Sequence, residues 1–392
     1  MQMMAVAGDT LYMCGLFSDK VFANREYAVA FSLSGKNVLS WNAAPDSNVV
    51  AIAFWGNQMY LGGYFESVNG VVRSNLAAID LATGEAIDWN PGTSQNGEVR
   101  DIVISGSTAY VCGDFTVAGG ASRNNIAALD LNTVENNATA WNPDLNLDVN
   151  AMVLGGSILY AGGDFTMAGG LPRLRLAALD TSKTTGMVTP WNPGADLSVK
   201  CLALGGTILY AGGDFSNIGG RTWNCIAALD TTVETASGTA WNVGMNGGTV
   251  YSMALRGTTL YIGGNFTTFS GTVRCNLAAL DTTKLTNNVT DWNPNMNYRV
   301  LEVACDKDVV YASGRFDTVG GVQQDYFAAL DANQDTNNLL PIDPELDNPG
   351  YAVAYAIIAD DEHLYLGGTI KTAGGKYRNN LVMVDKETAQ TY

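Results

Sequence analysis

Residues 199–215 read VKCLALGGTILYAGGDF, residues 225–230 read CIAALD, and residues 239–242 read TAWN. The same order of residues recurs along the whole chain, and each copy is anchored by a tyrosine that shortly precedes a glycine. Self-similarity at a nearly fixed period is the signature of a repeat architecture. The anchoring tyrosines, 48 to 54 residues apart, are Tyr12, Tyr60, Tyr110, Tyr160, Tyr210, Tyr261, Tyr311 and Tyr365.

Each copy holds four short apolar runs that are separated by glycine, threonine and asparagine-rich turns. Runs of this length between turn residues indicate strands rather than helices. Four strands per repeat in eight copies predict an all-β fold, an eight-bladed β-propeller with four antiparallel strands per blade. A solenoid of the same repeat is the alternative. The predicted blades of the single domain 1–392 are approximately 1–48, 49–98, 99–148, 149–198, 199–249, 250–299, 300–353 and 354–392.

The repeated residues have structural explanations. A tryptophan in the fourth run supplies a large apolar surface between blades, so we expect core packing rather than a row that stacks on carbohydrate. The glycine pair after the tyrosine leaves the backbone bare and permits positive φ. The aspartate that ends the third run suits a turn in which its side chain accepts backbone N–H groups. The tryptophans are Trp41, Trp89, Trp141, Trp191, Trp241 and Trp292.

The pattern LYxGGxF, RxxLAALD, WNP and VxALA resembles the delta-60-type propeller repeat of secreted bacterial and archaeal proteins. The order of a double glycine after the second strand and a tryptophan in the fourth also resembles kelch repeats. The resemblance covers nearly all of the 392 residues and implies a propeller fold. It also implies an extracellular or cell-surface location, and it implies little about the ligand.

Composition excludes several function classes. The chain has 21 Lys and Arg against 38 Asp and Glu, a net charge of −17, so nucleic acid is not an expected partner. No apolar run is long enough for a transmembrane segment. The single histidine, His363, excludes a multi-histidine metal site, and we expect it to be a solvated turn residue. The six cysteines lack regular spacing and are predicted to be small buried hydrophobes.

One couple recurs in the loop after the second strand. An acid after the glycine pair is followed nine residues later by arginine, as in Asp114 with Arg123 and Asp164 with Arg173. This spacing predicts an ion-pair or hydrogen-bond ladder that fixes the loop. Departures from a repeated pattern can mark functional sites. The departures noted are Trp223 with Arg221 in the fifth repeat, and Arg315, Gln324, Ile342 and the linker acids Asp343, Glu345 and Asp347 in the seventh.

Two sets of ligand-binding residues follow. The first set lies near blades 7, 8 and 1 and comprises Arg315, Gln324 and Asp325. The second set is a variable position in the first strand of each repeat, which could line a pocket near the propeller axis or point into the seams between blades. Residues at that position are Gln2, Val50, Arg100, Asn150, Lys200, Tyr251, Leu301 and Tyr355, of which Arg100, Lys200, Tyr251 and Tyr355 are the candidates.

No cofactor is expected, and calcium is the ion that the sequence allows. Two segments have D-x-N-x-D spacing with oxygen ligands, but neither continues to the glycine and glutamate of an EF-hand loop. Polar turn residues are the simpler reading of both. The segments are Asp144, Asn146 and Asp148, and Asp331, Asn333 and Asp335.

The sequence therefore predicts a non-enzymatic extracellular or surface module that serves as a scaffold, adhesion or assembly domain. Its partner would be a protein or further copies of the chain. A lectin-like module that binds polysaccharide, with calcium assistance, is the alternative. A glycan-active enzyme is the second alternative, because carboxylate pairs can cleave glycosides and propellers can host them between blades.

Overall fold

In a computed structural model, the described part of the chain consists of strands, turns and loops, with no helix. Accordingly, no helix long and apolar enough to cross a bilayer occurs among these residues. The chain divides into two compact units, residues 1–173 with 177–189 and residues 174–176 with 190–392. The structure describes residues 3–7, 10–19, 25–32, 37–38, 43–94, 97–346, 354–359, 363–368, 370, 372–377 and 381–391.

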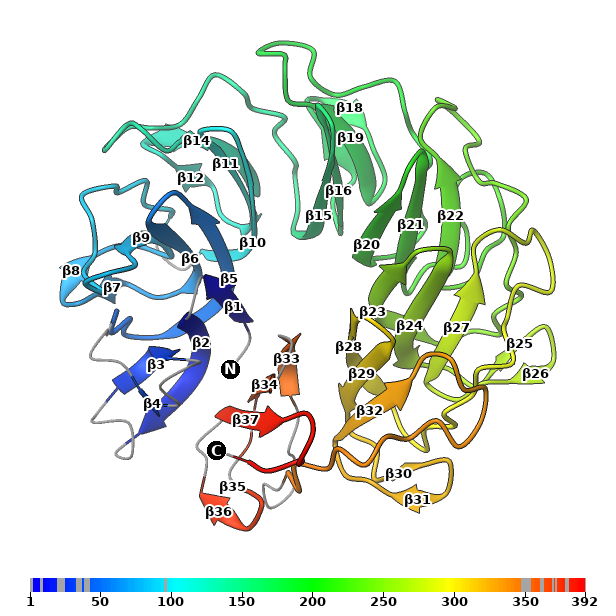
Figure 1. Ribbon diagram of the computed structural model, residues 1–392. Coiled ribbons are helices and arrows are strands. Elements are labelled where there is room, and N and C mark those ends of the chain that lie inside the picture. The colour runs from blue at the N-terminus through cyan, green and yellow to red at the C-terminus, as the bar shows by residue number, and fades with distance from the viewer. Residues whose placement is uncertain are drawn as a thin grey trace. The chain divides into compact units, whose positions relative to one another are not determined.

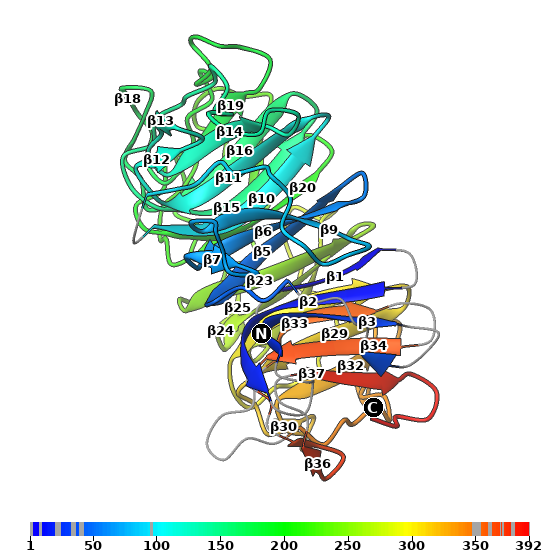
Figure 2. The same cartoon turned by 90° about the vertical axis from the view of Figure 1, so that its left-hand side faces the viewer.

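The first unit is built from antiparallel sheets whose strands lie side by side in the order in which they occur along the chain (Figure 1). Its first sheet has four strands, β1 (Met3–Ala7), β2 (Thr10–Asp19), β3 (Arg25–Ser32) and β4 (Asn37–Val38). Three-stranded sheets follow, and Figure 2 shows their strands side by side. They are β5 (Asn48–Trp55), β6 (Gln58–Tyr64) and β9 (Leu76–Asp80); β10 (Glu98–Ser105), β11 (Thr108–Asp114) and β14 (Ile126–Asp130); β15 (Val149–Gly155), β16 (Ile158–Gly163) and β19 (Leu176–Asp180).

The second unit repeats the same three-stranded sheet. Its strands are β20 (Val199–Gly205), β21 (Ile208–Gly213) and β22 (Ile226–Asp230); β23 (Thr249–Arg256), β24 (Thr259–Asn265) and β27 (Leu277–Asp281); β28 (Val300–Asp306), β29 (Val309–Gly314) and β32 (Phe327–Asp331); β33 (Ala354–Ala359), β34 (His363–Gly368) and β37 (Leu381–Asp385). The first three predicted apolar runs of each repeat are these strands, so the repeat is confirmed as the unit of structure.

The loop between the second and third strands contains a small hairpin that the sequence analysis did not predict. In most repeats its turn is the glycine pair of the loop, such as Gly169 (φ +55°) and Gly170 (φ +74°). Two consecutive left-handed residues form the tight hairpin turn that glycine favours. The hairpins are β7 (Ser67–Val68) with β8 (Val71–Val72), β12 (Val117–Ala118) with β13 (Ala121–Ser122), β17 (Met167–Ala168) with β18 (Leu171–Pro172), β25 (Thr268–Phe269) with β26 (Thr272–Val273), β30 (Thr318–Val319) with β31 (Val322–Gln323), and β35 (Thr372–Ala373) with β36 (Lys376–Tyr377).

The predicted fourth strand is the main correction to the blade. Outside β1–β4 and the small hairpins, the described sheets have three strands. The fourth run contributes only an isolated antiparallel bridge, such as Leu129 with Ala138 or Leu280 with Val289. Trp141 and Trp292 lie three residues beyond these bridges rather than within a strand. The run is short because the chain must leave its own sheet there to carry the tryptophan to the next one.

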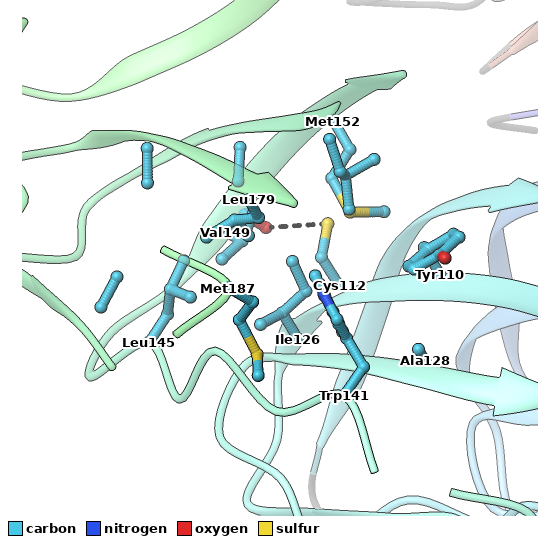
Figure 3. Close-up of a cluster of buried hydrophobic side chains, with 14 of the residues drawn as sticks. Tyr110, Cys112, Ile126, Ala128, Trp141, Leu145, Val149, Met152, Leu179 and Met187 are labelled. Atoms are coloured by element: carbon cyan, nitrogen blue, oxygen red, sulfur yellow. Dashed lines mark hydrogen bonds between the residues drawn. The ribbon is translucent and has the colours of Figure 1, made fainter. Parts of the chain in front are cut away.

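Each tryptophan ties its own repeat to the following sheet. The ring of Trp141 packs edge-on against the ring of Tyr110, with the ring centroids 5.2 Å apart. Its indole N–H donates to the carbonyl of Asp180 at 3.0 Å. Trp141 is 3% exposed and lies in an apolar cluster with Val149 and Leu179 (Figure 3). Trp89, Trp191, Trp241 and Trp292 donate to the aspartate carbonyl of the next sheet in the same way. The core role predicted for these tryptophans is confirmed.

The turn prediction is also confirmed. The cysteine prediction holds for Cys112 and Cys225, which are buried, whereas Cys201, Cys275 and Cys305 are half-buried and the side chain of Cys14 lies outside the described residues. Asp180 accepts the backbone N–H and the hydroxyl of Ser182, and these hydrogen bonds lower the pKa of the carboxyl. Cys112 is buried, and its thiol approaches the Val149 carbonyl at 3.6 Å within the same cluster (Figure 3). Burial raises the pKa of the Cys112 thiol, so it behaves as a small core side chain.

The seventh repeat places Ile342 in the tryptophan position. Ile342 is buried beside Tyr311, and a cavity of about 300 Å³ remains between these residues and Lys386. The Tyr311 hydroxyl is buried and has no hydrogen-bond partner in the described structure. The smaller side chain thus leaves space that an indole fills in other repeats.

Replacing Ile342 by tryptophan should therefore stabilise the second unit by about 1 kcal/mol, the usual gain from filling a cavity. The surrounding residues suit the change, because Pro341 and Pro344 match Pro190 and Pro193 around Trp191. Denaturant titration measures the shift, with Ile342→Leu as the control that should change little. A lower midpoint for Ile342→Trp would show that this space is not an unfilled tryptophan site.

Candidate functional site

The recurrent arginines bind backbone carbonyls and not the acids predicted for them. Arg173 donates to the carbonyls of Pro172 at 2.8 Å and Thr189 at 2.7 Å, and it is 8% exposed. The ion-pair version of the predicted ladder is therefore wrong, whereas its hydrogen-bond version holds with different partners. Arg73, Arg123 and Arg274 make equivalent bonds. The guanidinium fastens the hairpin to the segment that leads to the tryptophan.

The seventh-repeat candidates have structural partners of their own. Gln324 is 4% exposed at the arginine position and donates to the Phe327 carbonyl at 2.9 Å, so it is bonded to the start of β32 and is not available to a ligand. Asp325 accepts from the Gln323 amide at 2.6 Å. Among the linker acids, Asp343 accepts the N–H of Glu345, and Asp347 lies outside the described residues.

The structure places Arg315 opposite a second arginine. Its backbone N–H donates to the carbonyl of Arg299 at 2.9 Å, which sets two arginines opposite each other at the end of β28 and β29. Both side chains are half-buried. Like charges in directly opposed positions destabilise a strand pair. The equivalent positions in the first unit hold acids, Glu98 with Asp114 and Asp148 with Asp164.

The variable position in the first strands is a β-bulge. The register skips Val50, Arg100, Asn150, Lys200, Tyr251, Leu301 and Tyr355 in their respective sheets. A bulge re-aims one side chain and sharpens the strand twist. The described side chains here are half-buried; Gln2 and the side chain of Tyr355 lie outside the described residues. The sequence variation therefore follows from a position that the sheet does not use for pairing.

The charged bulge residues are in ion pairs. In the first unit, Arg100 binds Glu98 at 3.0 Å, Asp148 at 2.7 Å and Asn150 at 3.3 Å. In the second unit, Lys200 lies 3.1 Å from Asp214. Tyr251 shares the bulge position with its ring half-buried. Arg100 and Lys200 thus already have carboxylate partners, so an anionic ligand would have to compete with them.

The D-x-N-x-D segments do not gather their oxygens. Asp144 accepts from Asn124, Asn146 accepts the N–H groups of Thr166 and Met167, and Asp148 accepts from Arg100. In the other segment, Asp331 accepts the N–H of Asn333 and the amide of Gln334, and the Asp335 carbonyl accepts from Asn293. Within the described residues, no group of three or more acidic, cysteine or histidine side chains is arranged to hold a metal.

His363 is a further correction. It is 4% exposed at the start of β34 and is paired in register with Asp385, rather than solvated in a turn. Two other titratable groups lie on first strands. Burial raises the pKa of Asp101 to about 6, although its carboxylate accepts the N–H groups of Ile102 and Met152. Burial raises the pKa of Glu302 to about 8, against a hydrogen bond from Ser252.

Trp223, which departs from the repeat pattern and was not among the predicted ligand-binding residues, lines a pocket. A cavity of about 380 Å³ in the second unit, here named the Trp223 pocket, is lined mainly by Trp223, Val243, Gly244, Met245, Asn246 and Ser270. Trp223 occupies the arginine position of the repeat. Arg221 instead bonds the loop to the segment before Trp241, by donating to the Gly238 carbonyl at 2.7 Å. The Arg221 guanidinium lies 5.7 Å from the centroid of the Trp223 ring.

Comparison with known proteins was made on sequence and on structure. No family model matches the sequence, and no curated protein matches it. BamB from Moraxella catarrhalis is similar in structure with a TM-score of 0.57 and 16% identity, covering 100% of this chain and 95% of that one. The computationally designed Ika8 protein gives a TM-score of 0.57 and 13% identity, covering 90% and 87%.

The fold is that of a β-propeller repeat protein. The WD40 β-propeller domain of Doa1 is a more distant neighbour, with a TM-score of 0.46 and 9% identity over 79% of this chain and 86% of that one. At such low identities, the likeness concerns the fold of the propeller and not its ligand. Function therefore has to be argued from the side chains of this chain.

Proposed function

We propose that this propeller is a non-enzymatic interaction module of an extracellular or cell-surface protein, with a role in scaffolding, adhesion or assembly. In this proposal its repeats are of the delta-60, kelch-like type and form eight blades. Its partner is a protein or further copies of the chain. The proposed location is supported by the sequence resemblance, and the proposed role by the fold and by the surface of its hairpins.

Exposed apolar side chains on the small hairpins carry the proposal. In the first unit, Val72 on β8 is 71% exposed and Leu171 on β18 is also exposed. In the second unit, Val273 on β26 and Val322 on β31 are exposed in the same part of the repeat. Val72 and Val273 directly precede the arginine position, and Leu171 and Val322 lie two residues before it. Apolar side chains that recur on this strand of the hairpin provide contacts that a partner can cover. The net charge of −17 favours a partner surface that carries basic residues.

The use of charged groups supports a non-enzymatic role. Arg100, Arg173 and Lys200 are held by hydrogen bonds or ion pairs within the repeats. Asp101 ties two neighbouring first strands together through the Met152 N–H. These contacts explain the polar residues as parts of the scaffold. The lectin and glycan-enzyme alternatives predict instead saturable polysaccharide binding that a chelator weakens, or release of sugar products with time.

Assembly from copies of the chain is the form of the proposal that can be tested with the chain alone, although its net charge favours a different, basic partner. Sedimentation velocity over a range of concentrations should show reversible association, and Val72→Glu should weaken it about tenfold, or ~1.4 kcal/mol. Val134→Glu is the matched control, because Val134 is 50% exposed in a turn after β14, in the same unit. Equal effects of the two variants on association would show that the hairpins do not form the interface. A strictly monomeric chain would leave only a different protein as partner.

A further inference from the structure

We propose that the Trp223 pocket binds a neutral saccharide unit. This inference goes beyond the proposed protein-docking role and does not depend on it. The pocket lies entirely within the second unit, between the loop that precedes β22, the segment 242–246 and the β25–β26 hairpin. Its volume is at the small end of the range of about 300–1,000 Å³ for ligand pockets.

Three departures from the repeat meet in this pocket. Trp223 stands at the position of Arg123, Arg173 and Arg274. Val243 stands where other repeats have Pro143, Pro193 and Pro294, and Ser270 stands where they have Gly169, Gly219 and Gly320. The three residues are far apart in sequence, yet all line one cavity. Independent drift would scatter such changes over the repeats, whereas a local function concentrates them.

Trp223 does not behave like the core tryptophans. The indole N–H groups of Trp191, Trp241 and Trp292 all donate to aspartate carbonyls, and these rings are fully packed. The Trp223 ring is half-buried, and its indole nitrogen is buried without a hydrogen-bond partner in the described structure. An unpaired buried donor is energetically costly. Trp223 therefore lacks the backbone hydrogen bond that accounts for the core tryptophans, and its ring forms part of the pocket wall.

The remaining lining residues determine the class of ligand. They are threonine, asparagine, serine, glycine and apolar side chains, and none of them carries a charge. Asn246 and Ser270 are exposed at the opening and offer an amide and a hydroxyl. An aromatic face beside neutral hydrogen-bonding groups suits the apolar faces and hydroxyls of a sugar ring. Because no carboxylate lines the pocket, calcium is not needed for this site.

Arg221 sets the orientation of the aromatic face. Its Nε–H is held by the Gly238 carbonyl, and its guanidinium packs on one side of the Trp223 ring. A cation that is stacked on an aromatic ring and held by a carbonyl keeps the ring in place at little cost in entropy. A Cβ at Gly244 would lie 2.0 Å from the Ser270 hydroxyl oxygen, so a larger residue there would displace that hydroxyl.

The test follows the indole N–H of Trp223 by ¹⁵N NMR on the full chain. The resonance is assigned as the one that Trp223→Phe removes from the eight tryptophan signals. The probes are maltotetraose, cellotetraose, mannotetraose and chitotetraose, with tetragalacturonic acid as the charged comparison. We expect one neutral probe to shift the Trp223 signal saturably, with or without a chelator.

Trp223→Arg restores the residue of the other repeats and lacks the reporting indole, so its binding is measured by isothermal titration calorimetry beside the wild type. We expect binding of that probe to be at least tenfold weaker. The other indole signals report whether this variant folds; if it does not, Ser270→Gly is used and should also weaken binding. Val322→Ser, on another hairpin of the same unit, should leave binding unchanged and separates this test from the docking proposal. The inference is overturned if none of the neutral probes moves the signal, if only the galacturonide does, or if Trp223→Arg binds equally well.

Discussion

Replacing Gly163 by alanine is expected to unfold the sheet β15-β16-β19, with a loss of at least about 3 kcal/mol, the upper range of overpacking costs. A Cβ at Gly163 would lie 2.1 Å from the carbonyl oxygen of Asp148 and 2.9 Å from the Cα of Val149. Both atoms belong to the backbone, so no side-chain rotation can relieve the clash. The close approach exists because Val149 pairs with Gly163 next to the bulge at Asn150.

The same glycine recurs in the other described repeats for the same reason. A Cβ would lie 1.9 to 2.2 Å from a carbonyl oxygen at Gly63, Gly113, Gly213, Gly264 and Gly314. The residue directly before this glycine, which is the first of the Gly-Gly pair, varies: Cys112 and Ser313 stand there in two repeats. Gly163 does not have a left-handed φ, so the positive φ predicted for this pair is not its explanation.

Gly156→Asn is the matched control, because Gly156 has φ +61° and open space around its Cβ position. Asparagine tolerates this conformation, so the control should cost under about 1 kcal/mol. Denaturant titration followed by circular dichroism compares the two variants. Equal stability of Gly163→Ala and Gly156→Asn would mean that the bulge does not require glycine.

Trp141→Ala should destabilise the first unit by about 3–5 kcal/mol, the usual cost of deleting a large aromatic core residue. The variant loses the edge-on contact with Tyr110, the hydrogen bond to the Asp180 carbonyl and the packing between two sheets. Trp141→Phe keeps an aromatic ring beside Tyr110 and loses the hydrogen bond, so it should fall between the wild type and Trp141→Ala.

Tyr64→Ala serves as the control for this series, since Tyr64 is an exposed aromatic residue of the same unit. Its loss should change the free energy of unfolding by less than about 0.5 kcal/mol. Thermal and denaturant unfolding, monitored by tryptophan fluorescence and circular dichroism, give the comparison. A small effect of Trp141→Ala would show that the sheets of this unit do not depend on the tryptophan for their packing.

Local patterns explain which parts of the structure were predicted. Strand positions follow from the spacing of apolar residues and turn residues, which depends on neighbours within a few positions. The burial of Trp141 and the turn made by Asp180 follow from the chemistry of single side chains repeated at a fixed period. The small hairpins were missed because two-residue strands are too short to show an alternating pattern.

Partners of side chains could not be predicted in the same way. Arg173 was expected to meet Asp164, but it binds the Thr189 carbonyl sixteen residues further on. Gln324 was expected to bind a ligand and His363 to be solvated in a turn, and both are buried. Spacing along the chain does not determine direction in space, and each of these side chains turns toward a segment whose position depends on the packed repeat.

The amino-acid sequence alone determined the repeat, the strands and the residues that fill the core, because period and turn chemistry are properties of short segments. Only the tertiary structure decided that the variable first-strand position is a bulge and that the second glycine makes room for a carbonyl. It also brought Trp223, Val243 and Ser270 into one pocket. These outcomes depend on distances between segments some twenty to fifty residues apart, which are set when the sheets and loops pack together.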